Sequence, residues 1–88
     1  SKDEILMCFK DVPSFNVKEG VKLIDMLVDN KICTSKREAR EFLKASSISI
    51  NDKKVTEEEM LITKDIAIEG ELLVIKRGKK KNFIGKIS

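Results

Sequence analysis

The sequence predicts an α+β fold in which two packed helices lie against a small, mainly antiparallel sheet. Apolar residues recur with helical spacing over residues 21–28, and a capped, strongly basic segment follows at 35–44. The segment 47–51 alternates polar and apolar residues, as a half-buried strand does. With 88 residues, the chain is long enough for one domain with a modest core.

The first twenty residues are expected to precede the main domain, which spans 21–88. Asp3 to Lys10 has the composition of a short helix, and Pro13 interrupts any continuation of that helix. Residues 11–20 are therefore interpreted as a connector.

The first helix of the main domain begins after Gly20 and is expected to stop near Asn30. Its apolar positions lie three or four residues apart, so they share one face. They are Val21, Leu23, Ile24, Leu27 and Val28. A short turn over 31–34 then leads to the basic helix.

The basic helix carries cations where a helix favours anions. Ser35 can cap it, and Glu38 three residues later completes the pattern of a capping box. Lys36 and Arg37 fall beside the positive pole of the helix dipole, at a cost of a few tenths to about 1 kcal/mol each. A phosphate bound at this end of the helix would turn that unfavourable electrostatic energy into a favourable one.

At about 100° per residue, the basic helix divides into a basic arc and an apolar arc. The basic arc consists of Lys36, Arg37, Arg40 and Lys44, and the apolar arc of Ala39, Phe42 and Leu43. An ordinary amphipathic surface helix has the same pattern, so this helix alone leaves both interpretations open.

Strands are expected at 47–51, at the aliphatic run 72–75 and at 82–87. Asn51 and Asp52 tolerate positive φ better than most residues, so a tight hairpin turn can form there without glycine. The acidic segment 56–70 is predicted to be a turn-rich excursion.

Charge is segregated along the chain, although the net charge is only +3. Counting Lys and Arg against Asp and Glu, the net charge is −2 over 1–30, +4 over 31–56, −5 over 57–75 and +6 over 76–88. Two separate basic blocks predict a patch that binds a polyanion, provided that the fold brings them together.

The composition excludes several kinds of site and predicts no cofactor. The chain has no histidine, and Cys8 and Cys33 lack the C-x-x-C spacing, so zinc-finger, HExxH and histidine-triad sites are excluded. Both cysteines are interpreted as reduced and cytosolic. The longest aliphatic run, 72–75, is far too short to cross a bilayer, so we expect no membrane association and a cytoplasmic location. Ser1 in place of Met is interpreted as the start of a fragment.

Several strings in this order resemble the alpha-L RNA-binding motif, also called the S-four-like domain. They are S-K-R-E-A-R from Ser35, I-N-D-K-K-V from Ile50 and K-R-G-K-K-K-N-F from Lys76. Together with V-P-S-F from Val12, they look more narrowly like the C-terminal tRNA-binding domain of bacterial tyrosyl-tRNA synthetases. The similarity runs from about Asp3 to Ile87.

The resemblance implies that the second helix, the neighbouring hairpin and the lysine-rich corner present the RNA surface. The residues that would bind phosphate are Lys36, Arg37, Arg40, Lys44, Asn51, Lys53, Lys54, Arg77, Lys79, Lys80 and Lys81. The chain departs from the family pattern at Ser46 and Ser47, where glycines are frequent, at Asp52, which replaces the usual turn glycine, and at Asn82-Phe83. Phe83 is interpreted as a core residue first and as a base-stacking residue second.

The leading hypothesis is therefore the tRNA-binding domain of a tyrosine-tRNA ligase, without catalytic residues of its own. Its expected partners are tyrosine tRNA, through the long variable arm and anticodon stem, and the catalytic domain of a homodimeric parent. Two alternatives stay open: a ribosomal-RNA-binding alpha-L module of another protein, and a basic protein-interaction domain whose patches meet an acidic partner or the acidic segment 57–75.

Overall fold

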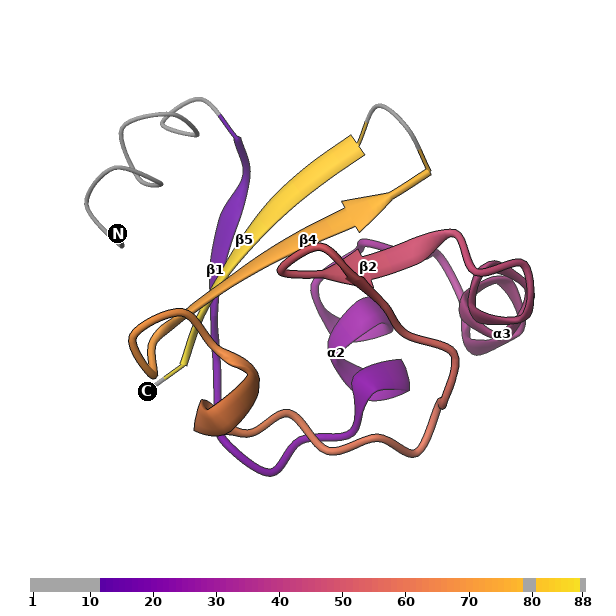
Figure 1. The fold of residues 1–88 in the computed structure, drawn as a ribbon. Coiled ribbons are helices and arrows are strands. Elements are labelled where there is room, and N and C mark those ends of the chain that lie inside the picture. Colours follow the sequence, from indigo (N-terminus) through magenta and orange to yellow (C-terminus); the bar gives the residue numbers. More distant parts are fainter. Residues whose placement is uncertain (1–11, 79–80, 88) are drawn as a thin grey trace.

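The structure is a computed structural model that describes residues 12–78 and 81–87 (Figure 1). The short helix predicted over Asp3 to Lys10 lies outside the described residues, as do two of the predicted RNA-binding residues, Lys79 and Lys80.

Five strands form one mixed sheet in the order β1-β5-β4-β2-β3. Every neighbouring pair is antiparallel except β1 and β5, which are parallel. The strands are β1 (Ser14–Val17), β2 (Ile48–Ile50), β3 (Lys53–Lys54), β4 (Leu72–Arg77) and β5 (Lys81–Ile87). The expected α+β fold with a mainly antiparallel sheet is confirmed, and β4 is a central strand as predicted.

Strand β1 corrects the interpretation of residues 11–20 as a connector. Its four residues pair with β5, and Phe15 lies opposite Gly85. A Cβ atom built on Gly85 would come within 3.1 Å of the Phe15 ring, so the glycine makes room for that ring. The strand is too short, and its partner too distant in the sequence, for local alternation to reveal it.

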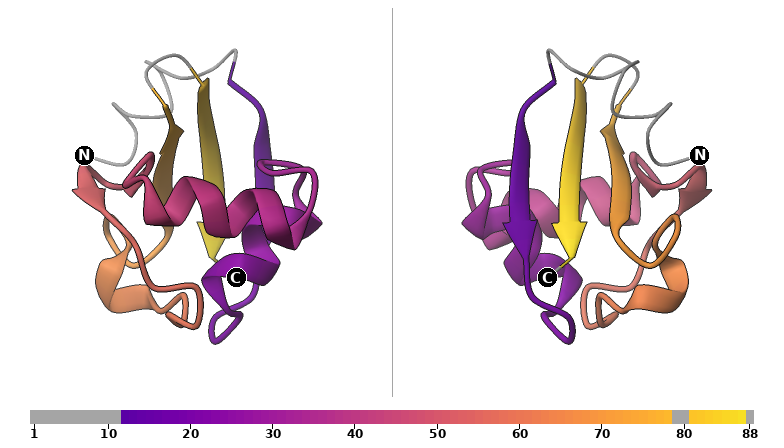
Figure 2. Two further views of the ribbon diagram at one scale, coloured as in Figure 1. Left: turned by 90° about the vertical axis from the view of Figure 1, so that its right-hand side faces the viewer. Right: turned by 90° about the vertical axis from the view of Figure 1, so that its left-hand side faces the viewer.

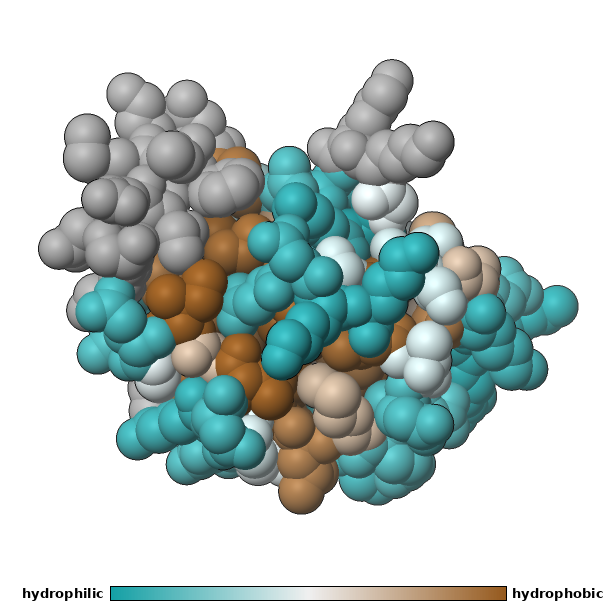
Figure 3. Space-filling model, in the orientation of Figure 1, coloured by the Kyte–Doolittle hydropathy of each residue, from teal (hydrophilic) through white to brown (hydrophobic). Residues whose placement is uncertain are grey.

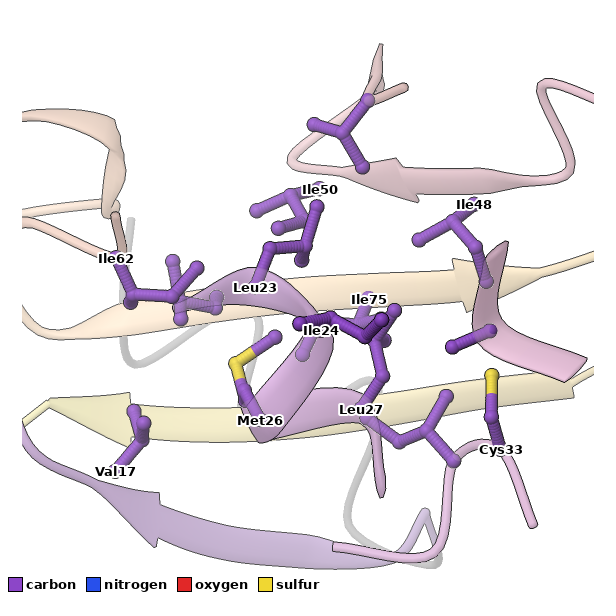
Figure 4. Close-up of a cluster of buried hydrophobic side chains, with 14 of the residues drawn as sticks. Val17, Leu23, Ile24, Met26, Leu27, Cys33, Ile48, Ile50, Ile62 and Ile75 are labelled. Atoms are coloured by element: carbon purple, nitrogen blue, oxygen red, sulfur yellow. The ribbon is translucent and has the colours of Figure 1, made fainter. Parts of the chain in front are cut away.

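Helices α2 (Leu23–Asp29) and α3 (Lys36–Lys44) pack on one face of the sheet (Figures 1 and 2). Both lie where the sequence predicts them, and α2 ends at Asn30 as expected. The buried face of α2 contributes Leu23, Ile24, Met26 and Leu27, which meet Ile75 of β4 in the core (Figure 4).

A smaller apolar cluster lies on the other face of the sheet. It consists of Leu72, Val74 and Ile84, with Ile68 packed against it. Residues 72–75 of β4 are therefore buried on both faces of the sheet, which explains the uninterrupted aliphatic run there.

The acidic excursion is turn-rich, as predicted, and contains only the 3₁₀ helix η1 (Lys64–Ile66). It also completes α2, which has no side-chain cap. The Leu23 N–H donates to the Met60 carbonyl at 2.7 Å, and the Ile24 N–H donates to the Glu58 carbonyl at 3.2 Å. The loop thus satisfies N–H groups that have no partner within the helix, and this fixes acidic residues 57–59 beside the helical layer.

Candidate nucleic-acid interface

The start of α3 is fixed by two side chains. The Glu38 N–H donates to the Ser35 hydroxyl oxygen at 3.1 Å, which confirms the predicted cap. The second half of the expected capping box differs, because the Glu38 carboxylate accepts from the N–H and the hydroxyl of Thr34, at 3.0 and 2.9 Å, rather than from Ser35. These hydrogen bonds lower the pKa of Glu38.

The predicted basic arc of α3 is exposed, and the apolar arc faces inward. Ala39 and Leu43 are fully buried, whereas Phe42 is partly buried against the core. The four basic side chains, Lys36, Arg37, Arg40 and Lys44, are all exposed. In Figure 3, hydrophilic side chains cover the side of the molecule on which α3 lies.

Acidic side chains border one flank of this arc. Arg40 Nε lies 2.7 Å from Glu58 Oε2, and Lys36 Nζ lies 3.7 Å from Asp25 Oδ1. The Glu58 contact arises because the acidic excursion is tied to the start of α2. Basic helix and acidic segment therefore meet within the chain, as one of the alternative hypotheses expected.

The remaining cations of α3, Arg37 and Lys44, form weaker ion pairs or none with the described residues. Arg37 Nε lies 3.8 Å from Glu41 Oε1, one helical turn away, and both side chains are largely exposed. For Lys44, no ion pair to any described residue is present. Because surface pairs contribute only about 0–1 kcal/mol, a phosphate can replace any of these partners at little cost.

The β2–β3 hairpin turns at Asn51 and Asp52, whose φ angles are 51° and 69°. Two consecutive positive φ angles define the tight turn that the sequence predicts. Lys53 and Lys54 are exposed on the short strand that follows. Asp52 lies at the tip and pairs with Lys76, with 3.2 Å between Oδ1 and Nζ.

Asn51 faces inward, unlike the other predicted phosphate-binding residues of the hairpin. Its side-chain oxygen accepts from the Val74 N–H at 2.8 Å, and its amide nitrogen donates to the Ile66 carbonyl at 2.7 Å and the Leu72 carbonyl at 3.3 Å. The side chain therefore joins the hairpin to β4 and η1, and we leave it out of the interface.

Arg77 brings the second basic block to α3. Its guanidinium donates to the Ile32 carbonyl, and its central carbon lies 5.4 Å from the centre of the Phe42 ring, within cation–π range. On the sheet, Arg77 is paired with Lys81. The described part of the second basic block thus begins beside the basic helix.

Two cations near the contact of Arg77 with α3 were absent from the RNA-binding residues that the sequence predicts. Lys76 pairs with Asp52 at the hairpin, and Lys31, directly after α2, lines a cleft with Arg77 and Lys81. Lys76 could have been predicted from the sequence, because it begins the second basic block, 76–88. Lys31 begins the first basic block, 31–56, but its place beside Arg77 and Lys81 depends on how α2 packs.

Cys33 lies in the environment of a structural thiol. It is buried, and that burial, with a smaller contribution from the charge of Glu38, raises its pKa to about 11. No group of three or more metal-binding side chains occurs in the part of the chain that the structure describes. The helices within residues 12–78 and 81–87 are all too short or too polar to cross a membrane.

Two helices on a mainly antiparallel sheet, with a basic second helix beside a basic hairpin, define the chain as a domain of the S-four-like, alpha-L class. Residues 4–84 match the family model described as "Tyrosine--tRNA ligase SYY-like C-terminal domain". The chain belongs to this family.

Relatives called Tyrosine--tRNA ligase agree with this assignment. The protein of Mycoplasma capricolum subsp. capricolum is 39% identical over 82 residues, which are 93% of this chain and 20% of the relative. That of Bacillus pumilus is 38% identical over 86 residues, 96% of this chain and 20% of the relative. That of Leuconostoc citreum is 42% identical over 88 residues, 99% of this chain and 21% of the relative. The chain thus spans about a fifth of the length of these relatives.

Proposed function

We propose that this domain binds tyrosine tRNA for a tyrosine-tRNA ligase, and that it does so mainly through the phosphate backbone. The observation that carries the proposal is the contact of Arg77 with Phe42 and Ile32, because it brings the second basic block against α3, the helix that carries the basic arc. The interface consists of Lys36, Arg37, Arg40, Lys44, Lys53, Lys54, Arg77 and Lys81, with Lys79 and Lys80 as its expected extension.

The arginine and lysine side chains of this interface have different roles in binding phosphate. Arg37 and Arg40 carry forked guanidinium groups that can hold a phosphate with two hydrogen bonds, whereas the lysines contribute compact positive charge. Arg77 is the positioning residue, since its guanidinium is already engaged with α3 and the preceding turn. Phosphate contacts orient an RNA without reading its bases, so selectivity would come from the shape of the tRNA.

The long variable arm and the adjoining anticodon stem are the proposed docking elements. Catalysis is assigned to a separate domain of a homodimeric cytoplasmic ligase, with this domain raising the affinity for its tRNA. The described interface residues include no nucleophile beside a base and no group of metal-binding side chains.

The proposal is tested by binding the 88-residue chain to a tyrosine tRNA transcript and to the same transcript with a shortened variable arm, across a salt series. If about five phosphates are neutralised, the slope of log K against log salt should be roughly −3.5 to −4.5 for the intact transcript. Shortening the arm should weaken binding. Equal binding to both transcripts would indicate a general RNA-binding module, and complexes that survive nuclease would indicate a protein partner.

A further inference from the structure

A cleft of about 430 Å³ opens where β4 and β5 extend beyond the helices. Figure 2 shows β1, β4 and β5 running past α3, so neither α2 nor α3 covers the upper part of the sheet. The cleft is lined by Val12, Pro13, Lys31, Arg77, Lys81, Asn82 and Phe83.

Phe83 supplies the aromatic surface of this cleft. It is paired with Ile75, a core residue on the helix-facing side of the sheet, and Arg77 is paired with Lys81 two pairs further along the same ladder. The ring of Phe83 packs against the core and still lines the cleft, where it is only partly buried.

The charged residues that line the cleft are all positive within the part of the chain that the structure describes. Lys31, Arg77 and Lys81 line the cleft, and no acidic residue is among the described residues that do so. Arg77 is held in place by the Ile32 carbonyl and the Phe42 ring. Lys31 adopts a left-handed backbone conformation, with φ of 61°, directly after α2.

An aromatic surface with cations around it fits a ligand that has a flat apolar face and a negative charge. A nucleotide has both features, and base–aromatic stacking tolerates any base. A nucleotide inside a duplex has both faces covered by its neighbours, so only an unpaired nucleotide can use this surface. We infer that the Phe83 cleft binds one unpaired nucleotide of the RNA, with the base stacked on Phe83 and the phosphate between Lys31 and Lys81.

This inference rests on the proposed function, because it assumes that RNA reaches the surface beside α3. It adds a contact with a base to an interface that otherwise contacts phosphates. Binding through phosphate contacts weakens as salt increases, whereas base stacking changes little. A salt series therefore separates their contributions to the affinity for RNA.

The test uses a tryptophan reporter, since the chain contains no Trp and no Tyr. Phe83→Trp keeps an aromatic ring in the cleft, and its fluorescence should be quenched when tyrosine tRNA is added. The control is Leu61→Trp, at an exposed position on the acidic excursion (51% exposed), which should stay bright.

Affinity measurements complete the test. Phe83→Leu should weaken tRNA binding by about 5- to 150-fold, the range expected for one stacked base, and leave the salt slope unchanged. Lys81→Ala should instead reduce the slope by about 0.7–0.9. A thermal melt shows whether Phe83→Leu is folded, and if it is not, the Phe83→Trp signal decides.

Quenching confined to Phe83→Trp, with a salt-independent loss in Phe83→Leu, is the expected result. Equal signals from both tryptophan variants, or full affinity of folded Phe83→Leu, would overturn the stacking site and leave salt-dependent tRNA binding intact. A wild-type chain that binds no RNA would overturn both proposals.

Discussion

The double substitution Arg37→Ala and Arg40→Ala tests whether the basic arc of α3 serves binding or stability. Its effect on folding follows from the two ion pairs that are lost. The Arg40–Glu58 pair is close, at 2.7 Å, but its side chains are 51% and 36% exposed, and the Arg37–Glu41 pair is longer and more exposed. Exposed pairs of this kind contribute about 0–1 kcal/mol each.

Removing Arg37 also relieves a cation near the positive end of the helix dipole, which offsets part of that loss. We therefore expect the free energy of unfolding to fall by less than about 1 kcal/mol. For a domain of this size, the midpoint of thermal unfolding should fall by less than roughly 8 °C.

The effect on RNA binding should be larger and should depend on salt. If each arginine neutralises one phosphate, the slope of log K against log salt becomes shallower by about 1.4–1.8. Fluorescence anisotropy with labelled tyrosine tRNA at several KCl concentrations measures this slope, and circular dichroism measures the unfolding midpoint.

A matched control is Lys18→Ala with Lys64→Ala, which removes the same charge at two exposed positions. Lys18 follows β1 and Lys64 begins η1, both away from α3 (Figure 1). The control should keep most of the slope. An unchanged slope in the arginine variant, equal losses in both variants, or an unfolded arginine variant would refute the reasoning.

Three further predictions concern groups that the structure places inside the fold or at the helix start. Asn51→Ala should lower the free energy of unfolding in urea by about 2–4 kcal/mol, because the Val74 N–H loses its acceptor; weaker RNA binding at unchanged stability would instead make Asn51 a binding residue. In a Cys8→Ser variant, Cys33 should react with iodoacetamide at neutral pH only after denaturation, since burial raises its pKa to about 11, and rapid labelling of the folded protein would contradict this. The pKa of Glu38 is lowered on folding, so its contribution to stability is present above the unfolded pKa and lost as pH falls through the folded one; Glu38→Gln should therefore lose less stability than the wild type between pH 6 and pH 3, and identical losses would exclude a role for this carboxylate.

Local patterns sufficed for the helices and for the hairpin. Ser35 and Glu38 mark the start of α3, and the spacing of apolar residues sets the inward face of both helices. The pair Asn51-Asp52 predicts the turn because both residues tolerate the positive φ that it requires.

Features that depend on distant partners could not be read from the sequence. Strand β1 exists because β5, which begins more than sixty residues later, offers it an edge, and Gly85 admits the ring of Phe15. The inward role of Asn51 likewise depends on Val74, and charge alone gives no sign of it. The contact between Arg40 and Glu58 arises only because the acidic excursion caps α2.

The central claim is that RNA binds along α3, the β2–β3 hairpin and the junction of β4 with β5. The most direct test is a titration of the ¹⁵N-labelled chain with an RNA hairpin that reproduces the variable arm of tyrosine tRNA, followed by amide chemical shifts. We predict that the perturbed amides gather in residues 35–44, 53–54, 76–78 and 81–83, and that η1 is unaffected. Perturbations concentrated in residues 57–70, or none at RNA concentrations that saturate anisotropy, would contradict the account.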